Sequence, residues 1–409
     1  MNVAGIVIFI VTYLLIAGRR ISWLRFDRPA GALLGALACV AFRVLTPEEA
    51  LGAVNASTIL LLFGVMGMGA FLALDGFFAG AETALVAAAR TPARLLGGIV
   101  WTSGILAAFI TNDAVCVLGA PLVVGLIRRH KLPALPFLLA LATAANTGSV
   151  ATLVGNPQNM LCAILGKLSY REHLLLVAPV AVLGLAINHG LLLLVFRNGL
   201  QRASLEATAS SGTLINRRTA MTLGVIAATA IAYTLGANLP FTATGGFVTL
   251  MLLHRRDTRQ LWARIDWSLL LFFAGLFVVV EGFMRSGATE WIFARLPLAA
   301  ASNGLVGWMR LSGIFLVGSN IVSNVPFILV VAKEMATLPD PKLGWELLAM
   351  ASTFAGNLTL LGSVANIIVA ENARDLGGIG FLDYLRVGLP LALLTTLVGV
   401  LWMVLVFPG

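Results

Sequence analysis

Long apolar stretches dominate this chain and restrict it to folds that span a lipid bilayer. Ten of them approach the ~20 residues that a helix needs to cross the hydrocarbon core. They are 1–17, 30–44, 58–74, 134–165, 174–196, 219–236, 240–253, 267–285, 347–370 and 387–407. Only 11% of the residues are charged, whereas soluble domains carry about 25%. The sequence therefore predicts an all-α polytopic membrane protein with about ten transmembrane helices.

Two further apolar stretches, 97–127 and 306–332, are too long for one crossing and too short for two. Polar residues interrupt each near its middle: TND at 111–113 in the first and SNVP at 323–326 in the second. Two half-helices that enter and leave on the same side would explain both interruptions. Such backbone is tolerated at membrane depth only where it is buried in protein or lines a wet cavity. We expect two re-entrant hairpins.

The distribution of basic residues supports this topology. With the N-terminus outside, the predicted inner loops hold 19 of the 27 Lys and Arg residues, as the positive-inside rule requires. Those loops are 18–29, 75–96, 128–131, 197–218, 254–266 and 371–386. If only one of the two hairpins crossed the membrane fully, every later loop would lie on the opposite side. The excess of Lys and Arg in the inner loops would then largely disappear. The mixed polar and apolar stretches 75–96 and 286–305 are predicted to be helices along the interface.

A weak internal duplication links the two halves of the chain. Residues 152–159 read TLVGNPQN and residues 359–366 read TLLGSVAN, and both segments lie inside an apolar crossing. The first follows Asn112 by 40 residues, and the second follows Asn324 by 35. Each segment is polar, contains a glycine and follows a polar hairpin tip at a similar separation in sequence. This pattern predicts two broken helices, over 134–165 and 347–370.

These features predict two repeats, 1–196 and 219–409, joined by a cytoplasmic linker at 197–218. Each repeat would contain five crossings and one hairpin, and this odd number of crossings inverts the second repeat relative to the first. Inverted repeats with broken helices are typical of secondary transporters, whose sites lie near the bilayer midplane. The sequence thus predicts a transporter site where tips and breaks meet.

The ends of broken helices expose N–H and C=O groups that can bind polar solutes and ions. Asn, Ser and Thr side chains add neutral donors and acceptors. The predicted substrate-binding residues are Thr111, Asn112, Thr152, Gly155, Asn156, Ser323, Asn324, Gly362, Ser363 and Asn366. Further candidates are Asn320, Cys116 and Cys162, the two cysteines because thiolates favour soft metals and metalloids.

Asp113 is the predicted site of the coupling ion. A carboxylate in the bilayer interior costs at least ~2.5 kcal/mol and usually marks a functional position. We expect it to bind H⁺ or Na⁺ during transport. The alternative is a structural role, in which Asp113 caps the half-helix that starts there.

Enzymatic and nucleic-acid functions find no support in the sequence. It contains no P-loop, HExxH or GxSxG motif and no paired catalytic carboxylates, so we expect no enzyme activity. Three cysteines in apolar stretches form no disulfide or zinc framework, and we expect neither cofactor nor metal site. The net charge of +9 is ascribed to basic inner loops and not to nucleic-acid binding.

The two tips and the two TL-x-G breaks resemble those of the ion transporter superfamily. That group includes ArsB-type arsenite efflux permeases, divalent anion/sodium symporters and NhaD-type sodium/proton antiporters. The pair Asn112-Asp113 is most similar to the arsenite permeases. Val325 departs from the Ser-Asn-Thr tips of the anion symporters, and the second break departs from the arsenite permeases. The resemblance implies a scaffold domain, a mobile transport domain and a homodimer in the bacterial inner membrane.

The resemblance implies export of arsenite or antimonite in exchange for protons by alternating access. The expected energy source is the proton gradient, or Na⁺, and the expected partners are a small inorganic or organic solute and the lipid bilayer. An arsenite permease would also associate with a cytoplasmic ATPase subunit. The alternatives are a sodium-coupled carboxylate or inorganic-anion transporter, a Na⁺/H⁺ antiporter, and a channel or non-transporting scaffold.

Overall fold

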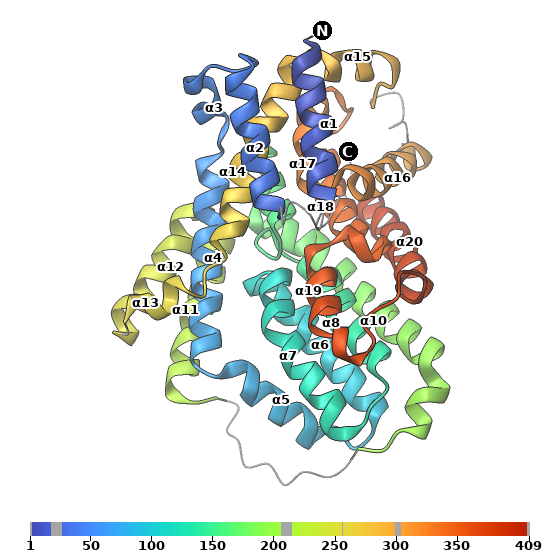
Figure 1. Cartoon of the computed structure of the whole chain (residues 1–409). Coiled ribbons are helices and arrows are strands. Elements are labelled where there is room, and N and C mark those ends of the chain that lie inside the picture. Colours follow the sequence, from blue (N-terminus) through green and yellow to red (C-terminus); the bar gives the residue numbers. More distant parts are fainter. Residues whose placement is uncertain (1, 18–26, 206–214, 256, 299–303, 407–409) are drawn as a thin grey trace.

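The computed structural model describes residues 2–17, 27–205, 215–255, 257–298 and 304–406. Within these ranges the chain is helical and contains no strand, which confirms the all-α class (Figure 1). The helices are α1 (Val3–Ala17), α2 (Arg28–Ala41), α3 (Pro47–Ala53), α4 (Ala56–Leu74), α5 (Phe77–Ala88), α6 (Pro92–Ile110), α7 (Asn112–His130), α8 (Ala134–Ser149), α9 (Pro157–Leu165), α10 (Tyr170–Arg202), α11 (Arg217–Thr234), α12 (Leu239–His254), α13 (Thr258–Trp262), α14 (Trp267–Arg285), α15 (Ala288–Arg295), α16 (Gly304–Val322), α17 (Asn324–Val331), η2 (Ala332–Thr337), α18 (Pro341–Leu358), η3 (Leu360–Gly362), α19 (Val364–Asn372), η4 (Arg374–Leu376) and α20 (Phe381–Val406).

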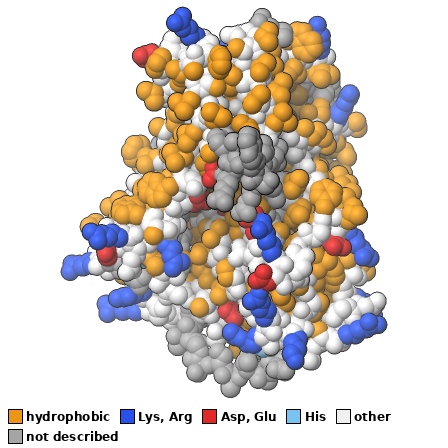
Figure 2. Space-filling view, in the orientation of Figure 1, with side chains coloured by type: hydrophobic (Ala, Val, Ile, Leu, Met, Phe, Trp, Pro, Cys, Tyr) orange, Lys and Arg blue, Asp and Glu red, His pale blue; other side chains and the backbone are white. Residues whose placement is uncertain are grey.

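Six of the described helices are long and apolar enough to cross a membrane: α4, α6, α10, α14, α16 and α20. Five shorter apolar helices, α1, α2, α5, α8 and α12, accompany them. This set agrees with a multi-pass membrane protein. On the face seen in Figure 2, hydrophobic side chains cover much of the upper part, whereas Lys and Arg gather mainly toward the lower part.

Two predicted segments differ in the structure. The stretch 75–96 is not one helix, because Thr91 caps a new helix and Pro92 occupies its first turn, so that α6 begins there. The predicted linker 197–218 is shorter at both ends, since α10 continues to Arg202 and α11 begins at Arg217. Residues 206–214 of that linker lie outside the described residues.

Helix starts are fixed by short polar side chains at the N-cap. Asn55 caps α4 by accepting from the backbone N–H of Thr58 at 2.9 Å, and Asn216 caps α11 in the same way through Thr219. At α3 the Thr46 hydroxyl and the Glu49 carboxylate form a capping box. These caps satisfy N–H groups that the first turn of a helix leaves without a partner.

Close backbone contacts hold the helices together at glycine. A Cβ atom on Gly148 of α8 would collide with the Gly104 carbonyl oxygen of α6, and one on Gly64 of α4 would lie 2.6 Å from the Ala243 carbonyl carbon of α12. Such contacts are typical of packing between membrane helices. Helices α1, α2 and α14 pack on one another, and α7 packs on α8 and α19. In Figure 1 the first group lies above α7 and α19.

Candidate functional site

The first polar tip is a sharp reversal between α6 and α7. Thr111 separates the two helices with a φ of 82° and a ψ of 142°, a region that is almost restricted to glycine. Its hydroxyl accepts from the Ala114 backbone N–H at 3.3 Å and so caps α7. The backbone N–H of Asn112 donates to the Gly155 carbonyl at 2.9 Å, which ties the tip to the first helix break.

The second tip repeats this geometry between α16 and α17. Ser323 has a φ of 73° and a ψ of 148°, and the following Asn324 begins α17. The Asn324 amide donates to the Gly362 carbonyl of the second break at 3.5 Å. Both tips therefore carry a hydroxyl residue in a strained conformation, and both contact the glycine of a break. Strain of this kind costs of order 1–3 kcal/mol and clusters at functional sites.

Both predicted broken helices are interrupted in the structure, and an asparagine satisfies the freed carbonyls in each. Asn159 donates to the carbonyls of Thr152 at 3.0 Å and Ser149 at 3.4 Å. Asn366 donates to the carbonyls of Thr359 at 3.2 Å and Gly356 at 2.7 Å. The two acceptors lie seven and ten residues earlier in both cases.

The next helices begin at capping residues. Asn156 caps α9 by accepting from the Asn159 backbone N–H at 2.8 Å, and Ser363 caps α19 by accepting from the Ala365 N–H at 3.2 Å. Each cap is the residue after the break's glycine, Gly155 or Gly362. The duplicated sequence segment thus has the same local role twice: it ends one helix and starts another.

Each break is also completed by a side chain from the other half of the chain. Thr353 of α18 accepts from the Asn156 amide at 3.0 Å and donates to Asn159 at 2.9 Å. In return, Asn146 of α8 accepts from Ser363 at 3.0 Å and donates to the Asn366 side-chain oxygen at 2.9 Å. The exchange is reciprocal, so the two breaks form one hydrogen-bonded unit.

This network fixes the orientation of Asn112. Peptide carbonyls accept from the Asn366 amide nitrogen, so its Oδ1 must be an acceptor and takes the Asn146 amide N–H. The Asn146 Oδ1 then accepts from the Asn112 amide nitrogen at 3.0 Å. The Asn112 Oδ1 is left without a partner in the part of the chain that the structure describes. Amide orientations are normally assigned from such hydrogen-bond networks. Here the backbone carbonyls that accept from Asn366 determine the orientations of the Asn366, Asn146 and Asn112 amides.

A cavity of about 230 Å³ lies where the tips and breaks meet. Its lining combines helices α1, α2, α7, α14 and α16–α17 with both breaks. The lining residues are Tyr13, Ile16, Arg28, Asn112, Asp113, Pro157, Gln158, Leu269, Phe272, Phe273, Ser319, Asn320, Ile321, Val322, Ser323, Asn324, Val325, Leu361, Gly362, Ser363 and Val364.

Five of these residues carry a buried polar atom that has no hydrogen-bond partner among the described residues. The atoms are Tyr13 Oη, Asn112 Oδ1, Asp113 Oδ1, Ser319 Oγ and Asn324 Oδ1. Buried polar atoms are normally paired, and an unpaired one costs about 1–3 kcal/mol. Their convergence on one cavity indicates a place where a bound polar species supplies the missing partners.

Not all predicted site residues line this cavity. Asn112, Asp113, Asn320, Ser323, Asn324, Gly362 and Ser363 do so, whereas Thr111, Thr152, Gly155, Asn156 and Asn366 lie behind it and hold the tips and breaks in place. Cys116 and Cys162 are fully buried and absent from the lining. The described residues include no group of three His, Cys, Asp or Glu side chains that could hold a metal ion.

Sequence reasoning missed several residues of this region: Tyr13, Arg28, Gln158 and Ser319 in the lining, and Asn146 and Thr353 in the hydrogen-bond network between the breaks. Asn146 sits in the middle of the apolar stretch 134–165, where one amide resembles a packing residue, although its neighbour Thr147 and Ser149 add to the polar signal. The sequence places Arg28 in a predicted inner loop, yet the structure shows it lining the cavity together with Asp113. The described residues of the lining therefore include one carboxylate and one guanidinium among neutral polar groups.

A buried acid–base pair contacts the end of α8, next to the first break. His173 Nδ1 lies 2.5 Å from Glu346 Oε2, and both side chains are almost completely buried. The other ring nitrogen, Nε2, lies 3.0 Å from the Val150 carbonyl at the end of α8. This pair joins α10 to α18 and does not line the cavity.

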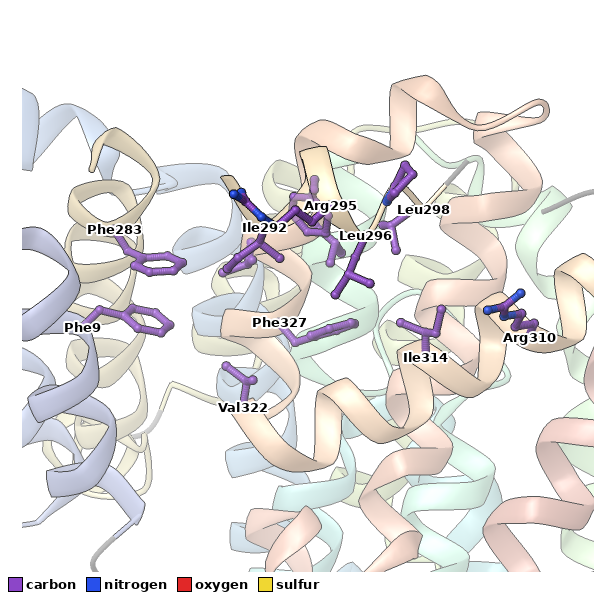
Figure 3. A pocket seen from close by; sticks show the side chains of 14 residues that line it. Phe9, Phe283, Ile292, Arg295, Leu296, Leu298, Arg310, Ile314, Val322 and Phe327 are labelled. Atoms are coloured by element: carbon purple, nitrogen blue, oxygen red, sulfur yellow. The ribbon is translucent and has the colours of Figure 1, made fainter. Parts of the chain in front are cut away.

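A larger cavity of about 650 Å³ is lined almost entirely by apolar side chains (Figure 3). It lies between the stacked rings of Phe9 and Phe283 on one side and Phe327 with Ile314 on the other. Its lining lacks the convergent amides and hydroxyls of the smaller cavity. We therefore assign the solute site to the polar cavity, in spite of its smaller volume.

Comparison with known proteins agrees with this architecture. Residues 13–355 match the family described as CitMHS, citrate transporter. The silicon efflux transporter LSI3 of Oryza sativa subsp. japonica is 31% identical, over 97% of this chain and 96% of that protein. The putative transporter arsB of Dictyostelium discoideum is 27% identical, over 98% of this chain and 92% of that protein.

A solved structure shares the fold. The crystal structure of the Alcanivorax borkumensis YdaH transporter, described as having an unusual topology, aligns with a TM-score of 0.54 at 17% identity. The alignment covers 91% of this chain and 87% of that one. The chain therefore belongs to the CitMHS citrate transporter family of the ion transporter superfamily, and it is a membrane transporter and not an enzyme.

Proposed function

We propose that this transporter exports a small neutral hydroxylated acid, with arsenite and antimonite as the main substrates, in exchange for protons. The observation that carries the proposal is a set of acceptor oxygens at the cavity, on Asn112, Asp113 and Asn324, that find no partner among the described residues. Neutral As(OH)₃ offers three O–H donors for such oxygens. A carboxylate anion offers only acceptors and would leave them unpaired.

In this proposal, Asp113 couples the entry of a proton to the export of a solute. When the carboxyl is protonated, its charge is removed and no cation or solute is needed to compensate it. When it is deprotonated, Oδ1 accepts from a solute hydroxyl. Proton and solute thus compete for one carboxylate, so a proton that enters displaces the solute outward. Alternating access would present the same cavity to each side in turn.

The relatives support this solute class. One is named a silicon efflux transporter and another a putative arsB transporter. Silicic acid and arsenous acid are both small, neutral and rich in hydroxyl groups near neutral pH. We extend this chemistry to the present chain as a proposal, together with its placement in a bacterial inner membrane with the N-terminus outside.

A second candidate is a sodium-coupled transporter of carboxylates or inorganic anions. The same three oxygens could ligate Na⁺, which prefers oxygen donors, and Arg28 at the cavity could attract an anion. The name of the matched family, citrate transporter, also favours this reading. A Na⁺/H⁺ antiporter would use the same oxygens without a solute.

Uptake by everted membrane vesicles separates these candidates. Arsenite accumulation that requires an acidic vesicle interior and no Na⁺ is the expected result. Asp113→Asn should abolish it, whereas Asp383→Asn, an exposed carboxylate at the start of α20, should not. Citrate or succinate uptake that requires Na⁺, with no arsenite signal, would instead establish the second candidate.

A further inference from the structure

The large apolar cavity lies between helices α1 and α14 on one side and the second hairpin on the other (Figure 3). The stacked rings of Phe9 and Phe283 face Phe327 of α17 across it. Its volume of about 650 Å³ is typical of a ligand site. Leu296, which is 70% exposed, also lines the cavity, so the cavity reaches the surface of the described chain. In a membrane protein, the apolar molecules at such a surface are lipids.

The described lining contains two charged side chains, and both are arginines. Arg295 ends α15, where its Cζ lies 3.9 Å from the centre of the Trp291 ring, and Arg310 lies in the second turn of α16. No carboxylate of the described residues lies within 4.0 Å of either guanidinium. Glu290 of α15 is outside the lining and is attracted by Lys333. The cavity therefore complements a molecule with an apolar body and an anionic group.

The length of the cavity fits one acyl chain. Arg310, Ile314 and Val322 line it in sequence along α16 (Figure 3). A helix rises 1.5 Å per residue, so about 18 Å of helix axis separates Arg310 from Val322. One leaflet of a bilayer contributes about 15 Å of hydrocarbon, which is half of the ~30 Å core. A cation at one end of an apolar wall of this length matches the head group and the chain of a phospholipid.

We propose that this cavity binds a phospholipid with an anionic head group, which places one acyl chain against the apolar wall and is attracted by Arg295 and Arg310. Basic pockets between membrane helices suit such head groups. The chain contacts Val322, which also lines the polar cavity and directly precedes Ser323 of the second tip. The lipid thus forms part of the wall behind the solute site. The inference concerns a separate cavity and does not depend on the proposed solute.

Native mass spectrometry of the full chain in detergent measures this binding. The probes are dioleoylphosphatidylglycerol and dioleoylphosphatidylcholine, which have the same chains and differ in the net charge of the head group. The first molecule of the anionic lipid should bind more tightly than the first of the zwitterionic lipid. Arg295→Gln/Arg310→Gln should weaken binding of the anionic lipid roughly tenfold and leave the other unchanged. Arg218→Gln, which removes an exposed arginine at the start of α11, is the matched control and should change neither.

Two further measurements locate the bound chain. Val330→Trp fills the cavity and should abolish binding of both lipids at this site, and Ile314→Trp gives the same readout if the first variant does not fold. A phosphatidylglycerol with a photoreactive group in its chain should cross-link to α16 or α17 in the wild type. Equal affinity for the two lipids, an unchanged affinity in the double arginine variant, or cross-links confined to other helices would each overturn the proposal.

Discussion

The two halves of this transporter share a hydrogen-bond pattern at their breaks but differ in charge at their tips. Asn159 and Asn366 make equivalent bonds to carbonyls seven and ten residues earlier. The residue after the tip asparagine is Asp113 in the first half and Val325 in the second. The polar framework is thus duplicated, whereas the titratable group is present once. Under the proposed mechanism, solute binding would draw on both halves, whereas coupling would depend on the first.

The largest effect is expected when this difference in charge is removed. Asp113→Asn keeps the size of the side chain and should reduce gradient-driven accumulation of arsenite roughly 100-fold, near the upper range of coupling between sites. Exchange of arsenite for arsenite should persist, because it requires no net proton movement. Accumulation and exchange are both measured in vesicles, and retained accumulation in this variant would remove Asp113 from the coupling role.

A second comparison is between Asn146 and Thr353, which complete each other's breaks. Asn146 takes part in four side-chain bonds, with Asn112, Asn357, Asn366 and Ser363. Thr353 makes two bonds of the reciprocal kind. Asn146→Ala leaves buried groups unpaired and should cost about 3 kcal/mol in unfolding free energy, against about 1–2 kcal/mol for Thr353→Ala. Thermal unfolding in detergent measures both, and the reverse order would show that the second half holds the unit together.

The third comparison tests whether the duplicated asparagines are equivalent. Asn159→Ala and Asn366→Ala each free two carbonyls at a helix break. Each should lower the unfolding free energy by about 1–3 kcal/mol, and the two values should agree closely. Denaturation midpoints of the purified variants provide the check. A large difference between the two losses of unfolding free energy would show that the two asparagines stabilise their breaks unequally in spite of their shared geometry.

The smallest effect concerns the strained tips. Ser323→Gly should stabilise the protein by about 1 kcal/mol, because the Ser323 side chain caps nothing and glycine adopts this backbone freely. Thr111→Gly should gain less, since it also loses the cap on Ala114. The melting temperatures of the two glycine variants, each compared with the wild type, measure these gains. Equal gains would contradict a capping role for Thr111.

The fold class could be predicted from the sequence because hydrophobic stretches and polar interruptions are local signals. The helix ends at Ile110 and Val322 coincide with the polar tips seen in the sequence. The boundaries of the proposed repeats, 1–196 and 219–409, stay a prediction, and so do the roles of the site residues. The proton or sodium coupling, the homodimer and the ATPase partner also stay predictions.

The cavity itself could be predicted only in part, because its lining depends on contacts between distant segments. Arg28 looked like an ordinary loop charge, and only the packing of α2 places it beside the residues of α7. Asn146 gave no motif, since its role comes from partners more than 200 residues away. Cys116 and Cys162 are near the tip and break in sequence, but they pack inside the protein.

The reciprocal bonds at the breaks have a consequence for how such a chain could have arisen. Asn146 completes the break at Ser363, and Thr353 completes the break at Asn156. A polypeptide of half this length would therefore have an unfinished helix break of its own and a spare side chain for another. It would become complete only by pairing with a second copy of itself. Fusion of two such genes would make that ancestral dimer permanent, and afterwards one copy alone could acquire the acidic group.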